Sequence, residues 1–552
     1  MVRLDSALHI LADIAVLQGR DREALELRLA AGHIASASPG TTASAAVHAA
    51  LDRIEAHGED LETQAMKELP SEVQLLGSDG RFTLRELVDL HRATGGTRLA
   101  DFRVALSHGA LEGVPLAERL RSALPGLQAR RRRTPLGRAR PQLEALARAW
   151  LEACPGLERM EPAGSIRRFD ATVGDLELLG AAADPAATLT ALARIQECSP
   201  LHVGPGRAVL RIDRSEVTIR LITPDLFGVA WLHLTGSPAH VEALQRRATA
   251  LGLRLELPGD GRPSRDFAGC SEEEIYAKLE LPFVPPEMRE GAGELEAASR
   301  GELPHLVTTD AIRGDLHMHT DWSDGRDPLD DMIRAARLLG YEYVAVTDHS
   351  GSSMVANGLD AGRLARQREA IERAREAYPD ITILHGSEVD ILPDGRLDFP
   401  DPVLERLDIV LASLHDAAGQ PPARLTDRYV SAMRHPLVHV VTHPTNRLVP
   451  SRPGYELDEE RLFTAARETG TFLEIDGAPG HLDMDGSMAR RAISAGVMVS
   501  VDGDCHRADL LGRHMEFAVG TARRGWVEAV SAVNTRPIAE LRALLARKRR
   551  AA

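Results

Sequence analysis

The amino-acid sequence predicts a multidomain protein of mixed α+β and α/β class. At 552 residues the chain is longer than one hydrophobic core supports. Its first 110 residues show apolar spacing of period 3.6, as in ALHILADIAVL, which predicts a domain of short helices. From Gly314 onward short apolar runs alternate with helical patterns, which predicts a parallel sheet or barrel.

Between these two parts the pattern changes twice. Residues 115–160 are expected to be helical and to end at Pro155-Gly156. Residues 160–285 alternate helices with short strands such as VGDLELLG and VTIRLIT. The following stretch, PPEMREGAGELEAASRGELP, is polar and rich in Gly, Glu and Pro, which predicts a linker before the C-terminal part.

Composition narrows the class of protein. Apolar residues make up 43% of the chain and charged residues 27%, as in an ordinary globular protein. No apolar run approaches the roughly 20 residues that span a bilayer, and the first residues do not resemble a signal peptide. We therefore expect a cytoplasmic protein without a membrane partner. The cysteines are far apart, which argues against disulfides and thiolate zinc sites: Cys154, Cys198, Cys270 and Cys505.

The charge distribution is uneven. A net charge of −15 does not by itself indicate a nucleic-acid-binding protein. Residues 119–140, however, contain eight arginines and no acidic residue. The run is either a solvated helix face or a site of phosphate contact, and the second interpretation is favoured because no carboxylate in the run neutralises it. The predicted DNA contacts are its densest part, Arg130, Arg131, Arg132 and Arg133.

Seven segments after Gly314 share one pattern, a short apolar run that ends in metal-ligand residues. They are GDLHMHTDWSDG, YVAVTDH, TILHGSEVD, DIVLASLH, HVVTHP, TFLEID and VMVSVDGDCH. The C-terminal ends of barrel strands meet at one mouth, so these side chains are expected to converge there. His317 and His319 are two residues apart, which on a strand places both rings on one face and Leu316 and Met318 on the other.

Nine ligand-type residues lie at these strand ends: His317, His319, Asp324, His349, Glu388, His415, His443, Asp504 and His506. Burying so many titratable groups without a cation would be costly. The sequence therefore predicts a metal site. Imidazole and carboxylate ligands without thiolate suit Zn²⁺, Mn²⁺ or Fe²⁺.

These motifs, together with THPTNRL, TFLEIDGAPGHLDMD and VGTARRGW, resemble the PHP (polymerase and histidinol phosphatase) domain over nearly all of residues 310–550. The resemblance implies a distorted (β/α)7 barrel that holds up to three divalent metals, Zn²⁺ and/or Mn²⁺. One metal would be bound by His317, His319, Glu388 and Asp504. A second would be bound by His415 and His443, with Glu388 bridging, and a third by Asp324, His349 and His506.

The resemblance also implies phosphoester hydrolysis. The implied attacking group is a metal-bridged hydroxide held by Glu388, His317, His319 and Asp504. Metal-bound imidazoles usually have a carboxylate partner. Asp348 and Asp476 are the residues expected to fill that role.

The segment AGSIRRFDATVGDLELL, with the arginine run before it and LTGSPAHVEALQRRA after it, resembles the palm and thumb of bacterial family-X DNA polymerases. The order of parts is the same as in that family. The implied organisation is a helical DNA-binding domain with degenerate helix-hairpin-helix motifs (1–110), a helical fingers-like region (111–160), a nucleotidyltransferase-like palm and thumb (161–285), a linker (286–312) and the PHP domain (313–552).

The polymerase site is only partly retained. Gly164, Ser165, Arg167 and Arg168 match a cradle for a triphosphate. The family requires three aspartates to hold two Mg²⁺, but this chain has Asp175, Glu177 and, in the third place, Thr218. We therefore doubt Mg²⁺ binding at the palm and expect DNA synthesis to be lost or severely reduced. The N-terminal hairpin PGTTASAA is degenerate too, because Thr42 replaces its second glycine.

These observations lead to four hypotheses. The first is a metal-dependent phosphoesterase of DNA repair, a 3′–5′ exonuclease with AP-endonuclease or 3′-phosphatase activity left open. Its partners would be DNA (gapped or 3′ ends) and, as an open question, dNTP. The alternatives are an active gap-filling DNA polymerase with PHP proofreading, a phosphatase for small phosphomonoesters, and a non-enzymatic DNA-binding protein. The intact ligand motifs argue against the last, and Glu177 and Thr218 argue against the polymerase.

Overall fold

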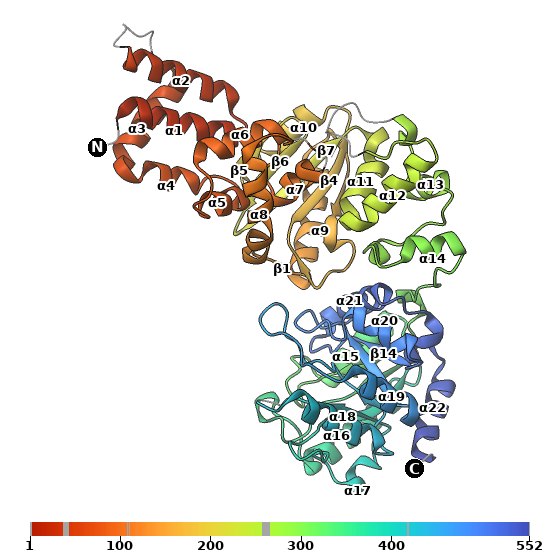
Figure 1. The fold of residues 1–552 in the computed structure, drawn as a ribbon. Coiled ribbons are helices and arrows are strands. Elements are labelled where there is room, and N and C mark those ends of the chain that lie inside the picture. Colours follow the sequence, from red (N-terminus) through yellow and green to blue (C-terminus); the bar gives the residue numbers. More distant parts are fainter. Residues whose placement is uncertain are drawn as a thin grey trace.

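The computed structural model has a helical N-terminal part, a central part around a mixed sheet, and a C-terminal barrel (Figure 1). The structure describes residues 3–36, 43–107, 109, 111–256, 265–416 and 419–550. The expected hairpin at Pro39–Thr42 therefore lies outside the described residues. Within the described ranges, no helix is long and apolar enough to cross a membrane.

The N-terminal part is a bundle around a single apolar core that runs from Ala7 to Leu127. Its helices are α1 (Leu4–Leu17), α2 (Asp21–Ala35), α3 (Ala45–His57), α4 (Leu61–Met66), α5 (Ser71–Gly77), α6 (Leu84–Thr94), α7 (Leu99–Ser107) and α8 (Pro115–Arg130). A capping box between Thr83 and Glu86 begins α6. The core thus continues through α8 and past the expected boundary near residue 110, because Leu120, Ala123 and Leu127 of α8 pack into it.

The central part is built on a five-stranded sheet in the order β2-β4-β7-β6-β5. Its strands are β2 (Leu157–Ala163), β4 (Leu176–Ala182), β5 (Ser199–Val203), β6 (Arg207–Ile212) and β7 (Ser215–Ile222). Strands β4 and β7 are parallel, and the other pairs are antiparallel. Helix α9 (Leu136–Ala153) packs its apolar face on this sheet, where Leu143 and Trp150 join the same core as Leu178 and Ile219.

A small helical subdomain follows the sheet. It contains α11 (Phe227–Thr235), α12 (Pro238–Ala250), α13 (Glu272–Lys278) and α14 (Glu294–Arg300). The stretch expected to be a linker includes α14 and is packed rather than free. Glu294 of this stretch is only 1% exposed. Its carboxylate accepts a hydrogen bond from His240 at 2.6 Å and two more from the backbone N–H groups of Gly291 and Ala292.

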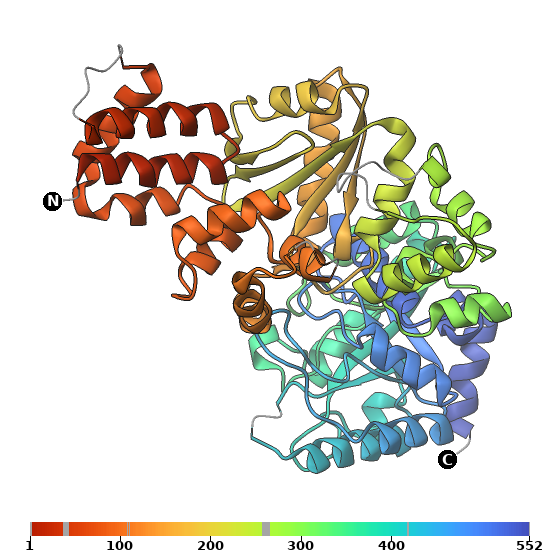
Figure 2. The same ribbon diagram turned by 45° about the horizontal axis from the view of Figure 1, so that its top comes forward.

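The C-terminal part is a barrel of seven parallel strands whose order in the sheet follows their order in the chain. In Figure 2 it is the part drawn from green to blue. The strands are β8 (Gly314–Met318), β9 (Tyr343–Val346), β10 (Thr382–Asp390), β11 (Ile409–Ser413), β12 (Val440–Val441), β13 (Phe472–Asp476) and β14 (Val499–Asp502). A bridge between Met318 and Cys505 links the first strand to the end of the last. The predicted β/α barrel is therefore confirmed.

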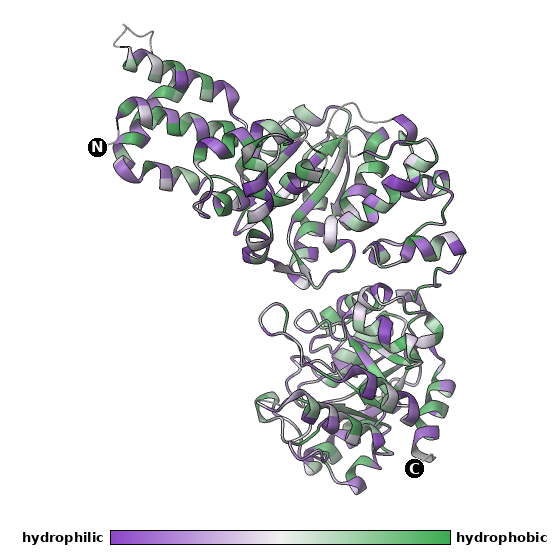
Figure 3. Cartoon of the chain, in the orientation of Figure 1, coloured by the Kyte–Doolittle hydropathy of each residue, from purple (hydrophilic) through white to green (hydrophobic). Residues whose placement is uncertain are grey.

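Helices cover the outside of the barrel, and hydrophilic and hydrophobic residues alternate along them (Figure 3). The longer ones are α15 (Leu329–Leu338), α16 (Ala361–Ala377), α18 (Pro422–Arg434), α19 (Glu459–Thr469), α20 (Gly486–Ser494), α21 (Leu511–Arg524) and α22 (Ile538–Arg550). In α15, for example, Met332, Ile333 and Ala336 are buried on one face.

One local expectation fails in β8. Leu316 and Met318 do not share one apolar environment, because they belong to different hydrophobic clusters. The register of β8 against β9 shifts between Asp315 and Met318, so the simple alternation of faces is interrupted there.

Candidate metal centre and palm site

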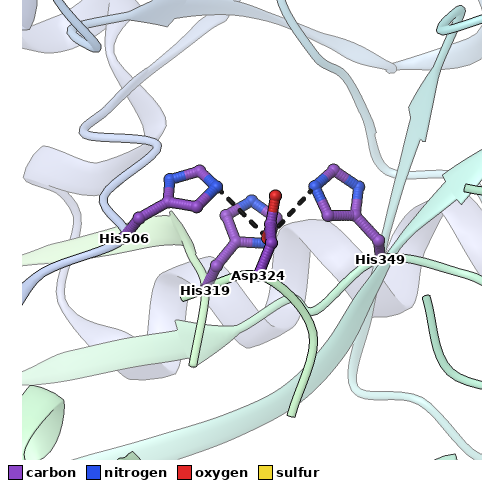
Figure 4. Close-up of side chains that lie close together, drawn as sticks. All are labelled: His319, Asp324, His349 and His506. Atoms are coloured by element: carbon purple, nitrogen blue, oxygen red, sulfur yellow. Dashed lines mark ion pairs between the residues drawn. The ribbon is translucent and has the colours of Figure 1, made fainter. Parts of the chain in front are cut away.

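The nine predicted ligand residues lie together at the C-terminal ends of the barrel strands. Among them, Asp324 lies between His349 and His506 with His319 beneath (Figure 4). One oxygen of Asp324 is 3.6 Å from His349 Nε2, 3.3 Å from His506 Nε2 and 3.9 Å from His319 Nδ1. Two donors that bind one cation at about 2.1 Å lie about 3.4 Å apart in tetrahedral geometry. The distances from Asp324 to these rings are therefore close to those expected for donors that share one cation.

A second group surrounds the two histidines of the first strand. Nε2 of His317 and Nε2 of His319 are 3.1 Å apart. Asp504 Oδ1 lies 3.6 and 3.1 Å from these two atoms, and Glu388 Oε2 lies 3.5 and 3.6 Å from them. The two imidazole nitrogens and Asp504 Oδ1 thus lie close enough to share one cation, and Glu388 Oε2 lies beside both rings.

Glu388 connects this group with a third one. Its Oε1 atom is 3.3 Å from His415 Nε2 and 2.9 Å from His443 Nε2, while its Oε2 atom is 2.9 Å from His349 Nδ1. The grouping differs from the expected one, since His319 also approaches Asp324 and His349 also approaches Glu388. Both rings lie between groups and present one nitrogen to each.

Several buried polar atoms of the pocket have no hydrogen-bond partner within the described part of the chain. Buried atoms without a hydrogen-bond partner there include His319 Nδ1, His349 Nδ1, His443 Nδ1, Glu388 Oε2 and Asp504 Oδ1. Buried polar atoms in proteins are normally satisfied. Burial alone would raise the pKa of the Glu388 carboxyl, but His349, His415 and His317 hold it well below its usual range. A set of imidazoles and carboxylates with open lone pairs fits divalent cations such as Zn²⁺ or Mn²⁺.

Two buried carboxylates orient the rings from behind, and the sequence analysis did not find them. Glu474 Oε1 is 2.7 Å from His317 Nδ1, and Asp390 Oδ1 is 2.7 Å from His415 Nδ1. Each contact leaves Nε2 directed at the pocket. Glu474 shares the inward face of β13 with Asp476, so the alternation in TFLEID could have indicated it.

The carboxylates expected in that role bind elsewhere. Asp348 accepts hydrogen bonds from Thr320, Ser323 and Gln367, which fixes the loop before Asp324 rather than a ring. Asp476 accepts one from the backbone N–H of Ala478 at 2.6 Å. Burial and the charge of Asp504 raise the pKa of the Asp476 carboxyl well above its usual value.

The palm residues lie on adjacent strands, as expected for a polymerase-like site. Glu177 of β4 stands directly opposite Thr218 of β7, and Asp175 precedes β4. Guanidinium groups surround the two carboxylates, however. Glu177 accepts hydrogen bonds from Arg98 Nη1 at 3.0 Å and from Arg220 Nε at 2.7 Å, and Asp175 pairs with Arg131.

This arginine cluster connects the N-terminal helices with the sheet. Arg98 precedes α7, and Asp101 within α7 pairs with Arg98, Arg207 and Arg220. Glu72 of α5 pairs with Arg131 and accepts a hydrogen bond from Leu99 N at 2.5 Å. Burial would raise the pKa of Glu177, but Arg98 and Arg220 lower it to about 2. The positions around the carboxylates are therefore filled by positive side chains of the chain itself.

The expected phosphate cradle is also engaged in internal contacts. Gly164 and Ser165 form a short 3₁₀ turn after β2. Arg167 pairs with Glu272, 2.6 Å away, and lies 3.4 Å from the ring centroid of Trp231. Arg168 pairs with Glu290 at 2.8 Å and donates to Thr235 O at 2.7 Å.

The four arginines predicted to bind DNA differ in their environment. Arg131 is half-buried and binds Glu72 and Asp175, so it is part of the arginine cluster. Arg133 bonds to Thr172. Arg130 is 3.7 Å from Asp79 but 55% exposed, and Arg132 is exposed. Acidic residues from other parts of the chain thus neutralise part of a run that contains no acidic residue of its own.

Comparison with known proteins identifies two family models along the chain. The model of the DNA polymerase beta thumb matches residues 230–290, and the PHP domain model matches residues 315–449. The DNA polymerase/3′-5′ exonuclease PolX of Bacillus subtilis (strain 168) is 36% identical over 393 residues, which are 70% of this chain and 68% of that protein.

Other relatives match only a part of the chain. A probable phosphatase of Thermoanaerobacter sp. (strain X514) is 33% identical over 214 residues, which are 37% of this chain and 82% of that protein. A crystal structure of Leishmania infantum polymerase beta in a ternary P/T complex is 19% identical and covers 40% of this chain and 98% of that one, with a TM-score of 0.26.

Proposed function

This chain belongs to the bacterial PolX family of polymerases with a PHP domain, and on that premise we propose that it removes nucleotides from the 3′ ends of DNA. The barrel is the hydrolase, and its relative from Bacillus subtilis is named a DNA polymerase/3′-5′ exonuclease. The observation that carries the proposal is the convergence of nine imidazole and carboxylate side chains with open donor atoms in one pocket.

The chain's own residues prepare this pocket for cations and for a phosphodiester. Glu474 and Asp390 hold the rings of His317 and His415 so that Nε2 faces inward. Glu388 reaches all three groups of donors and is 1% exposed. Divalent cations bound there, Zn²⁺ and/or Mn²⁺ in up to three positions, would supply an activated water and stabilise charge on the phosphate.

We further propose that the palm no longer copies DNA. Templated synthesis needs two Mg²⁺ ions held by carboxylates next to a triphosphate. Here Thr218 carries no charge, and Asp175 and Glu177 are neutralised by Arg131, Arg98 and Arg220. A cation could bind there only by displacing guanidinium groups from a buried ionic network. This displacement is strongly unfavourable because it leaves a buried charge without its partner.

The role that remains for the polymerase-like half is to bind DNA. The exposed Arg130 and Arg132 support it, since each can contact a phosphate on a protein of net charge −15. We propose gapped DNA or 3′ ends as the substrate. Binding of a dNTP is the less well supported part of the proposal, because Arg167 and Arg168 of the cradle are already paired with Glu272 and Glu290.

A test uses purified protein, Mn²⁺ and end-labelled gapped DNA, with and without dNTPs. We expect shortening of the labelled strand that disappears in His317→Ala and persists in Asp175→Ala. Strand extension that disappears in Asp175→Ala would overturn the proposal in favour of a working polymerase.

A second substrate class is supported by the probable phosphatase of Thermoanaerobacter sp. (strain X514), which matches 37% of the chain. DNA that ends in a 3′-phosphate separates the two classes. Release of inorganic phosphate without further shortening indicates a phosphatase, and release of mononucleotides indicates an exonuclease.

A further inference from the structure

The loop between β13 and α20, residues 477–485, lies between the metal centre and the palm. It is tied to the segment that follows the ligand His443. Thr445 Oγ1 donates to Asp483 Oδ2 at 2.9 Å, Arg447 Nε donates to His481 O at 2.9 Å, and Val449 N donates to Gly480 O at 2.7 Å. Asp483 is fully buried. Movement of one segment must therefore move the other.

His481 on this loop contacts a ligand ring directly. Its ring is stacked on His443, with centroids 5.2 Å apart and planes 20° apart. Its Nδ1 atom is buried and has no hydrogen-bond partner in the described part of the chain. His481 is not one of the nine ligand residues. Its observed interaction with the centre is the stacking itself.

The other side of the loop rests on the palm. Leu482 is 1% exposed and belongs to the same apolar core as Leu136 of α9. Pro479 packs so closely on Gly137 of α9 that a Cβ added there would lie 2.2 Å from Pro479 Cβ. Only a glycine leaves room for this approach.

The surrounding interface makes this contact stiff. Arg140 of α9 pairs with Glu516 of α21 at 3.0 Å, and Arg513 of α21 pairs with Glu144 of α9 at 3.0 Å. Gly520 of α21 lies against the ring of Phe169. Helix α9 and the barrel therefore cannot separate around the loop without breaking these two ion pairs.

We propose that His481 is a positioning residue, and that α9 holds it against His443 through the contact between Gly137 and Pro479. The palm thereby fixes the orientation of one metal ligand in the barrel. This inference rests on the proposed hydrolytic function. It gives the polymerase-like half a part in catalysis that does not depend on nucleotide binding.

The first test is Gly137→Ala in the full-length protein. Alanine is a better helix former than glycine, so α9 itself is not weakened. The new Cβ must instead push Pro479 away by about 1.5 Å to reach normal contact distance. The matched control is Gly126→Ala in α8, an exposed helical glycine with no neighbour within 4 Å of the added Cβ.

We expect faster hydrogen exchange of residues 443–449 and 477–485 in metal-free Gly137→Ala, and a Mn²⁺ affinity and kcat/KM lower by about 10-fold or more. Gly126→Ala should match the wild type in all three. Unchanged exchange and unchanged Mn²⁺ affinity in Gly137→Ala would overturn the proposal. Absence of hydrolysis in the wild type would instead refute the proposed function. The hydrogen-exchange result would still decide whether α9 positions His481.

The second test separates stacking from hydrogen bonding at His481. His481→Phe keeps a flat ring against His443, and His481→Ala removes it. We expect His481→Phe to keep Mn²⁺ affinity within about 3-fold of the wild type and His481→Ala to lose about 10- to 100-fold. Equal losses in both variants, or no loss in either, would contradict a stacking role.

Discussion

The rings of His317 and His415 are held by carboxylates on the nitrogen that faces away from the pocket. Glu474 and Asp390 each lie 2.7 Å from Nδ1 of their ring. Such partners fix the tautomer and raise the basicity of the ligand nitrogen. The affinity of the site for metal therefore depends also on Glu474 and Asp390, which are not among the nine ligand residues.

We predict that Glu474→Gln lowers Mn²⁺ affinity by about 10- to 100-fold, because the amide no longer supplies a negative partner to His317. Isothermal titration of the metal-free protein measures the loss. Asp476→Asn is the matched control on the same strand, since burial and nearby Asp504 already favour the neutral carboxyl by raising its pKa. A larger loss in Asp476→Asn than in Glu474→Gln would contradict this assignment.

The residue scale also shows what the sequence reveals about a site. The convergence of the nine side chains could be expected because they lie at or shortly after the ends of apolar runs, and strand ends in a barrel converge. The alternation in TFLEID could have indicated Glu474, but not the ring that it meets. Asp390 and His481 could not be predicted, because their roles depend on which ring each one meets across the barrel. Charge neutralisation was equally hidden: Arg131 has no acid near it in sequence, yet it binds Glu72 and Asp175.

At the scale of elements, α7 and the strands β4, β6 and β7 are joined by the arginine cluster. Arg98 and Asp101 belong to the helix side, and Glu177, Arg207 and Arg220 to the strands. Each buried charge has several partners of opposite sign, so removal of one charge leaves others unpaired. This face of the palm sheet is thus a structural contact with the N-terminal helices.

The pKa of Glu177 gives this contact a defined pH dependence. Its value is about 2 in the folded protein, below the usual 4.5, because Arg98 and Arg220 outweigh the effect of burial. The resulting stabilisation, on the order of 3 kcal/mol, is complete above pH 4.5 and is lost as the pH falls toward 2. We predict that the stability advantage of the wild type over Glu177→Gln shrinks over this window. Urea unfolding at pH 7, 4 and 3 measures it, and a pH-independent difference would contradict the assignment.

The elements themselves were predicted unevenly. Alternating apolar runs with helices were sufficient for the barrel. The stretch before it was expected to be a linker because of its Gly, Glu and Pro content. Its residue Glu294 is, however, buried and hydrogen-bonded to His240, which lies on a helix more than 50 residues earlier in the chain. Likewise the shift in β8 depends on its pairing with β9, which no local pattern encodes.

At the scale of the whole molecule, electrostatics must favour DNA locally. A net charge of −15 repels DNA at long range. Affinity for DNA therefore has to come from exposed arginines that contact its phosphates. Arg132 is exposed, whereas Arg131 is committed to the arginine cluster.

We therefore predict that Arg132→Ala weakens DNA binding and lowers the slope of log K against log salt by about 0.7 to 0.9, the loss of one phosphate contact. Arg121→Ala is the control, because Arg121 is exposed too but pairs with Glu118 of its own helix. Fluorescence anisotropy at several salt concentrations gives the slopes. An equal effect of both variants would show that the contact is not specific to Arg132.

The three parts of the molecule also act on one another. Helix α9 belongs to the core of the palm, yet its Gly137 meets the loop that touches a metal ligand. The polymerase-like half and the barrel are therefore in direct contact next to the candidate metal centre.

The central claim is that the nine donors hold divalent cations and that these cations hydrolyse DNA 3′ ends. The most direct measurement adds Mn²⁺ stepwise to protein stripped by a chelator and records bound metal per chain and nucleotide release together. We predict that release rises in parallel with bound Mn²⁺, up to three ions, and that His317→Ala binds less metal and releases none. Full hydrolysis by protein that elemental analysis finds free of metal would contradict the account.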